Sequence, residues 1–255
     1  MSAVLMGGGN SIAYDELSLI PVPESTPSWT PIPWKFLVDT VLSRVESAGW
    51  TVNDVNLLTS GKDKETGLPQ ELFGTIGLSS DDGEIAPQVG LRTSYNMTYK
   101  VVVCAGGRVI VCSNGMFIGE FEVALRKQTT FALRDITGRI DAGVSRIQEA
   151  YDRTRQRRDF LRTIPLSEDD GFSLIGVAVG REVITPTMAN VAYRDWRNPE
   201  HEAFSNRDAW SLYNCFTEGA KKTRAGNLLT AHTDIDSFFV NEVSLAVLDY
   251  DEVPF

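Results

Sequence analysis

The stretch "YKVVVCAGGRVIVCSNGMFIG", residues 99–119, carries the clearest secondary-structure signal in the chain. Runs of β-branched residues lie on both sides of Gly106 and Gly107, and a Gly-Gly pair can adopt the positive φ values of a two-residue turn. The pattern predicts a β-hairpin over about 100–112, with Cys104 opposite Val109. Because both faces of this hairpin are largely apolar, its strands are expected to be central in the sheet.

Helical periodicity appears on both sides of this hairpin. A helix is predicted at 34–48, where apolar residues recur at three- and four-residue steps and Gly49 marks the end. A long helix is predicted over about 130–158, and Pro165 prevents its continuation. The fold class is therefore α+β, with an antiparallel sheet that contains the central hairpin and is backed by the long helix. An OB-type barrel with added helices is the alternative.

Composition divides the chain into three parts. Residues 1–33 hold a glycine run at 7–9 and five prolines between Pro21 and Pro33, so a flexible N-terminal lead-in is expected. Residues 34–233 are expected to form a single α+β nucleic-acid-binding domain. Residues 234–255 contain six acids and no Lys or Arg, so they are expected to form an acidic C-terminal tail.

Several features place the chain among cytoplasmic proteins. No run reaches the roughly 18 apolar residues that a membrane span requires, and the N-terminus lacks the pattern of a signal peptide. The three cysteines are too few for a disulfide framework, and free thiols suit a reducing compartment. We therefore expect a location in the bacterial cytoplasm, without membrane contact.

Charge is distributed unevenly along the chain. The net charge of −10 would by itself disfavour a polyanionic partner. Between Arg126 and Arg162, however, ten basic residues stand against five acidic ones. The densest part of this segment contains Arg153, Arg155, Arg157, Arg158 and Arg162. These arginines favour a basic helix that helps to hold DNA, although a solvated surface and helix-pairing or oligomer contacts remain alternatives.

No catalytic constellation is recognisable. The two histidines, His201 and His232, lie in different polar contexts without a patterned nucleophile nearby. The acidic loops at 81–84 and 168–170 would hold metal ions only if the fold brought them together. We expect no enzyme activity, no catalytic residue, no metal and no cofactor.

The segment "LRTSYNMTYK", residues 91–100, combines aromatic and cationic side chains. It holds Arg92, Tyr95, Tyr99 and Lys100, and in an extended strand the two tyrosines would share one face. Rings that stack on bases, together with cations that follow the backbone, are what a sequence-tolerant single-strand binder requires. Half-buried strand tyrosines are the alternative reading.

A resemblance covers about half of the chain, residues 91–223. "LRTSYNMTYKVVVCAGGRVIVCSNGM", the pair Arg126 and Lys127, and the later "WSLYNCFTEGAKKT" resemble a phage- and plasmid-like family known as a domain of unknown function. The chain departs from that family with Asn96 where an acid is common and Gln128 where a histidine is common. The resemblance implies a mobile-element setting.

The terminal "DYDEVPF" is similar to the acidic tip of bacterial single-stranded DNA-binding proteins. Its acids and terminal carboxylate can meet cations on a partner, its phenylalanine can fill an apolar pocket, and its proline limits the unbound conformations. The expected partner-binding residues are Asp249, Tyr250, Asp251, Glu252, Val253, Pro254 and Phe255. The tip can also occupy the basic surface of its own chain until DNA displaces it.

These observations together predict a phage or mobile-element single-stranded DNA-binding protein for replication and recombination, which recruits other replication or recombination proteins through its tip. The expected DNA contacts are Arg92, Tyr95, Tyr99, Lys100, Arg108, Arg126, Lys127 and Arg134. Two alternatives stay open: a single-strand annealing recombination protein, in which the chain would form a homo-oligomer, and a DNA-mimicking inhibitor of a host defence or nucleic-acid enzyme.

Overall fold

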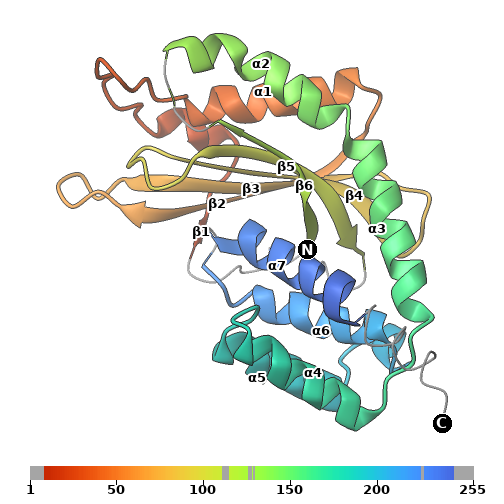
Figure 1. The fold of residues 1–255 in the computed structure, drawn as a ribbon. Helices are drawn as coiled ribbons and strands as arrows, with labels where there is room; N and C mark the ends of the chain where they lie inside the picture. Colours follow the sequence, from red (N-terminus) through yellow and green to blue (C-terminus); the bar gives the residue numbers. More distant parts are fainter. Residues whose placement is uncertain (1–8, 111–114, 126–127, 129, 225–226, 244–255) are drawn as a thin grey trace.

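The computed structural model describes residues 9–110, 115–125, 128, 130–224 and 227–243. The fold is α+β, as expected, and its centre is an antiparallel sheet in which each strand pairs with its neighbours in sequence (Figure 1). The strands are β1 (Asn10–Ser11), β2 (Val52–Lys62), β3 (Pro69–Leu78), β4 (Ile85–Ser94), β5 (Val101–Val109) and β6 (Gly115–Leu125). Because β1 and β6 are the two ends of this strand order, the sheet is open, which confirms the favoured form over the OB-type barrel.

The prediction of a hairpin turn at Gly106 and Gly107 is wrong. Both glycines lie inside β5, where they pair with β4 on one side and with β6 on the other. A Cβ atom added at Gly107 would lie 2.6 Å from Cγ2 of Thr154 on the helix that packs over this strand. This glycine is therefore needed for close packing between helix and strand, which a local sequence pattern does not distinguish from a turn.

A Gly107→Ala variant is expected to lose about 1–3 kcal/mol of unfolding free energy, because the new methyl group overlaps Thr154. Adding Thr154→Ser, which removes the closest methyl group, should recover part of this loss. Gly83→Ala is the matched control, since nothing lies within 4 Å of a Cβ atom there. Equal denaturant midpoints for the Gly107 and Gly83 variants would contradict this packing.

The single long helix expected over about 130–158 is two helices, α2 (Thr130–Val144) and α3 (Ile147–Arg162). The helix break lets the two segments pack on different partners. α2 lies beside α1 (Trp34–Ser47), and both cover one face of the sheet (Figure 1). α3 runs along β4 and β5 toward the remaining helices. The predicted helix at 34–48 is confirmed as α1, whose Leu37, Val38 and Val41 are fully buried.

The other helices pack beneath the opposite face of the sheet (Figure 1). The short helix η1 (Asp15–Leu19) lies beside α1 on the first face. The helices beneath the opposite face are α4 (Glu168–Gly180), α5 (Pro186–Arg197), α6 (Ala209–Ala220) and α7 (Leu228–Phe238), with the short segments η2 (Glu202–Phe204) and η4 (Phe239–Val243). Trp196, Trp210 and Phe216 are at the centre of their core, which also contains Ile85 and Val109 from the sheet. No helix in the described part of the chain is long and apolar enough to cross a membrane.

Two of the expected domain boundaries need correction. Leu17 and Ile32 are buried in the core between α1 and the sheet, so these two residues anchor the expected lead-in to the domain, although Leu19 and Val22 between them are exposed. The boundary at 233/234 falls inside α7, and Phe239 and Val243 of η4 are buried among the helices. The expected acidic tail therefore begins no earlier than residue 244, and residues 244–255 lie outside the described residues.

Candidate nucleic-acid interface

Tyr95 does not share a face with Tyr99. The Tyr95 ring stacks on Trp34 with 4.5 Å between the ring centroids, and its hydroxyl accepts a hydrogen bond from the Trp34 backbone N–H at 3.1 Å. Only 5% of Tyr95 is exposed, and burial raises the pKa of its hydroxyl to about 12. The predicted base-stacking role of Tyr95 is therefore wrong. The reason is that β4 ends at Ser94, so the alternation of an extended strand does not hold beyond it.

Tyr99 instead lies over the opposite side of the sheet, in contact with residues of β3 and β4. The guanidinium of Arg92 is 5.6 Å from its ring centroid, and the ring of Phe73 meets it edge-on at 5.4 Å. Phe73 is the strand partner of both Leu58 and Arg92, so these three residues form a row across β2, β3 and β4. The buried Leu58 and Phe73 thus support the partly exposed Tyr99.

The turn from β4 to β5 is held by a reciprocal pair of hydrogen bonds. The Tyr99 backbone N–H donates to Oγ of Ser94 at 2.9 Å, and the same hydroxyl donates to the Tyr99 carbonyl at 3.2 Å. Lys100 follows Tyr99 and is exposed. We call Leu58, Phe73, Arg92, Tyr99 and Lys100 the β4–β5 corner. Sequence reasoning found three of its members and missed Leu58 and Phe73, whose place depends on strand register.

Arg108 was predicted to contact DNA, but its guanidinium is bound to a carboxylate of the protein itself. Its Nη1 contacts both carboxylate oxygens of Asp54, at 3.0 and 2.9 Å. The guanidinium reaches from β5 to β2 across Gly77, where a Cβ atom would lie 2.8 Å from Nη2 of Arg108. The Arg108 side chain, which was expected to contact DNA, is therefore engaged in an ion pair within the protein.

The arginines of α3 are also paired inside the molecule. Arg158 binds Asp82 at 3.0 Å and Glu84 at 3.1 Å, and Arg162 binds Glu84 at 2.8 Å. Further ion pairs join Arg155 to Asp82 and Arg157 to Asp236 of α7. These contacts fasten α3 to the β3–β4 loop and to α7. The interpretation of this run as a DNA-holding surface is therefore corrected.

Asp82 is the centre of this ion-pair network. Its side chain is 9% exposed and that of Arg158 is 10% exposed. Burial alone would raise the pKa of Asp82, but hydrogen bonds from the backbone N–H groups of Glu84 and Ile85, together with Arg158, lower it below its ordinary value. The carboxylate is thus held in its charged form.

The two acidic loops do not combine into a metal site. Asp82 and Glu84 face α3, whereas Asp170 accepts hydrogen bonds from the backbone N–H and the hydroxyl of Ser167 at the start of α4. Among the residues that the structure describes, no three His, Cys, Asp or Glu side chains are grouped in a way that could hold a metal ion.

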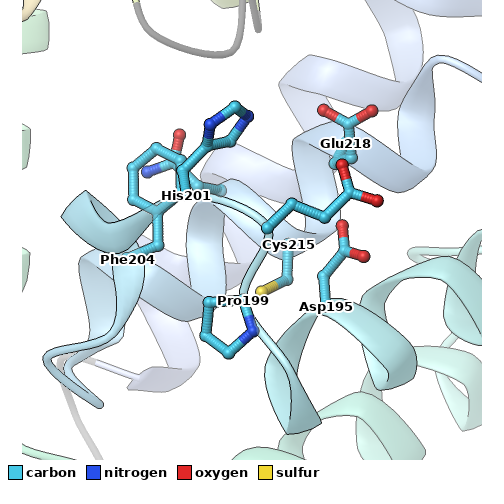
Figure 2. Close-up of a pocket in the computed structure, with 8 residues that line it drawn as sticks. Asp195, Pro199, His201, Phe204, Cys215 and Glu218 are labelled. Atoms are coloured by element: carbon cyan, nitrogen blue, oxygen red, sulfur yellow. The ribbon is translucent and has the colours of Figure 1, made fainter.

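A small pocket lies between α5 and α6 (Figure 2). It is lined by Asp195, Pro199, Glu200, His201, Phe204, Asn214, Cys215 and Glu218. His201 packs edge-on against Phe204, with 5.8 Å between the ring centroids. The other histidine, His232, is 2% exposed, and burial lowers the pKa of its imidazole to about 4, so it is neutral at neutral pH.

The remaining predicted contacts fall outside the described part of the chain. Arg126 and Lys127 are not described, and neither is the side chain of Arg134. The tip residues at 249–255 are likewise outside the described residues. The last described residue of β6, Leu125, pairs with Val101, which follows Lys100 of the β4–β5 corner.

Comparison with known proteins adds no relative. No family model, no curated protein and no solved structure matches the chain. The resemblances to the phage- and plasmid-like family and to the acidic tip stay predictions.

Proposed function

We propose that the protein binds single-stranded DNA without sequence preference and acts in the replication and recombination of a phage or other mobile element. The observation that carries the proposal is the β4–β5 corner, where the ring of Tyr99 contacts both Arg92 and Phe73 and precedes the exposed Lys100. An aromatic ring supports base stacking, and adjacent cations attract the phosphate backbone. The alternative is that Tyr99 is a half-buried tyrosine with only a structural role. That alternative predicts no DNA binding at this corner.

The chemistry of this corner favours single strands over duplex. A base must leave its stack to place its face on a protein ring, and unpaired bases do so at lower cost. Bases of every type have a π face, so the contact tolerates any sequence. The internal pairing of Arg108 and of the α3 arginines limits the number of cations available for phosphate, so we expect a modest affinity with a shallow salt dependence.

Partner recruitment belongs to the same proposal. The terminal sequence of acids, valine, proline and phenylalanine has the chemistry of a ligand for a basic, apolar pocket on a replication or recombination protein. Deleting residues 249–255 is expected to leave the affinity for single-stranded DNA equal or higher, because an acidic competitor is removed. A titration of the truncated chain beside the full chain checks this, and weaker binding by the truncated chain would contradict it.

The binding proposal is tested by fluorescence anisotropy with a labelled oligo(dT) strand and a matched duplex over a series of salt concentrations. We expect tighter binding of the single strand and an affinity that falls with salt, by a log–log slope of about −0.7 for each phosphate contacted. Affinity that is independent of salt, or equal for duplex, would rule out this mode. A complete lack of binding would favour the DNA-mimicking inhibitor instead.

A further inference from the structure

The face of the sheet that carries the β4–β5 corner continues along β2 and β3 beyond the corner. Residues paired across an antiparallel sheet point to the same face, and so do residues two apart along one strand. Leu58 pairs with Phe73, and two positions further along these strands Asn56 pairs with Thr75. Asn56 and Thr75 therefore form the next row on the face against which Tyr99 packs, about 7 Å from the row of Phe73.

This second row is accessible on β2, whereas the β5 side of the same face is covered. Asn56 is exposed and Thr75 is half-buried. On β5, by contrast, Val102 and Cys104 are buried and pack with Leu229 of α7. In the described part of the chain, α7 therefore covers the β5 side of this face and leaves Asn56 open to a ligand.

The charges on either side of the corner determine the direction in which a bound strand can leave it. On one side, Glu71 lies one row beyond Phe73, and an acidic residue at this position repels phosphate. On the other side, Nη1 of Arg108 lies 2.9 Å from Oδ2 of Asp54, and Nδ2 of Asn56 donates to Oδ1 of the same carboxylate at 2.7 Å. The negative charge of Asp54 is thus compensated, so the side with Asn56 opposes a DNA strand less.

The chemistry of Asn56 and Thr75 suits the edge of a base of any type. An amide and a hydroxyl each donate and accept hydrogen bonds, so neither requires a particular base. Neither side chain carries a charge, so contacts here add affinity without adding to the salt dependence. Bases that lie on separate rows of a sheet must be unstacked from one another, which again favours a single strand over a duplex.

We propose that a DNA strand bound at the β4–β5 corner continues onto β3 and β2, so that the nucleotide next to the one stacked on Tyr99 lies over Asn56 and Thr75. This path rests on the proposed function and adds to it the course of the strand, which leads away from Glu71. The alternative is an ordinary solvated face of an antiparallel sheet. That alternative predicts that a charge placed at residue 56 has no effect on DNA binding.

Charges of both signs at residue 56 test the path, by anisotropy titration of the full chain with oligo(dT). Asn56→Arg is expected to add about one phosphate contact, which steepens the log–log salt slope by about 0.7 and tightens binding about fourfold at roughly 0.15 M salt. Asn56→Glu should weaken binding by a similar factor. Ser173→Arg and Ser173→Glu, at an exposed position of α4, are the matched controls, because such charges are screened beyond about 8 Å.

Opposite effects at residue 56, with none at residue 173, support the path. Arg and Glu are both longer than Asn, so damage to the fold would change the affinity in the same direction for both variants. Equal affinities of Asn56→Arg and Asn56→Glu, changes in the same direction, or equal changes at residues 56 and 173 would overturn the path and leave binding at the corner standing. A wild-type chain that does not bind oligo(dT) would overturn both the path and the proposed function.

Discussion

An Arg158→Ala variant is expected to lose about 3–5 kcal/mol of unfolding free energy. Removing the guanidinium takes the principal ion-pair partner from the buried carboxylate of Asp82 and leaves it with the more exposed Arg155 and two backbone N–H donors, and breaking a buried ion pair is costly. For a chain of this size the loss corresponds to a melting temperature about 10 °C lower. Thermal and urea unfolding of the purified variant, followed by circular dichroism, measure it.

Arg139→Ala provides the matched control for this substitution. Arg139 pairs with Asp135 at i,i+4 on α2, and both side chains are about half exposed. A pair of this kind contributes about 0.3–0.5 kcal/mol. If the two variants unfolded at the same temperature, the network around Asp82 would not be what fastens α3 to the β3–β4 loop.

The same network gives a pH dependence with a defined sign. The folded-state pKa of Asp82 is lower than its ordinary value of 3.8, so the folded state binds this proton less readily than the unfolded chain does. The stabilisation is therefore complete above about pH 4 to 5 and is lost as the pH falls through the folded-state pKa. Asp82→Asn should be less stable at neutral pH, with a smaller further loss on acidification. An equal acid-induced loss in wild type and variant would contradict this assignment.

A Tyr99→Ala variant is expected to bind single-stranded DNA about tenfold more weakly, or weaker still, because a base that stacks on an aromatic ring contributes about 1–3 kcal/mol. Tyr99→Phe keeps the ring and should retain most of the affinity. Tyr193→Ala is the matched control, since it removes an exposed tyrosine on α5, far along the chain from the β4–β5 corner. Anisotropy titrations at one fixed salt concentration compare the variants.

Two outcomes of this comparison would contradict the proposed interface. If Tyr99→Ala bound DNA as tightly as the wild type, the corner would not contact bases. If Tyr99→Phe were as weak as Tyr99→Ala, the hydroxyl rather than the ring would matter, and stacking would be the wrong mechanism. A stability measurement on each variant shows whether loss of the contact with Phe73 has unfolded the corner.

The parts of the fold that sequence predicted are those determined by local periodicity. The amphipathic spacing of α1 and the α+β class with an open antiparallel sheet follow from patterns that span a few residues. The turn predicted at Gly106 and Gly107 was wrong because glycine is suited both to a tight turn and to close packing against a helix. The choice between them depends on Thr154, almost fifty residues further along the chain.

In the candidate site, too, the groupings of residues close in sequence were predicted, and the contacts between distant residues were not. Arg92, Tyr99 and Lys100 are neighbours in sequence, so their grouping was visible. Tyr95 was misplaced because its stacking partner, Trp34, lies 61 residues away. The α3 arginines were misread for a similar reason, since Asp82 and Glu84 are more than seventy residues from Arg158. A run of like charges in sequence carries no information about the opposite charges that the fold brings to it.

We propose that DNA contacts the β4–β5 corner and not the arginines of α3, which form ion pairs within the protein. Hydrogen exchange of the full chain, measured by mass spectrometry with and without oligo(dT), tests this directly. We predict that DNA slows exchange in peptides covering residues 92–103 and leaves those covering 150–162 unchanged. Protection of α3 without protection of the corner would contradict the claim.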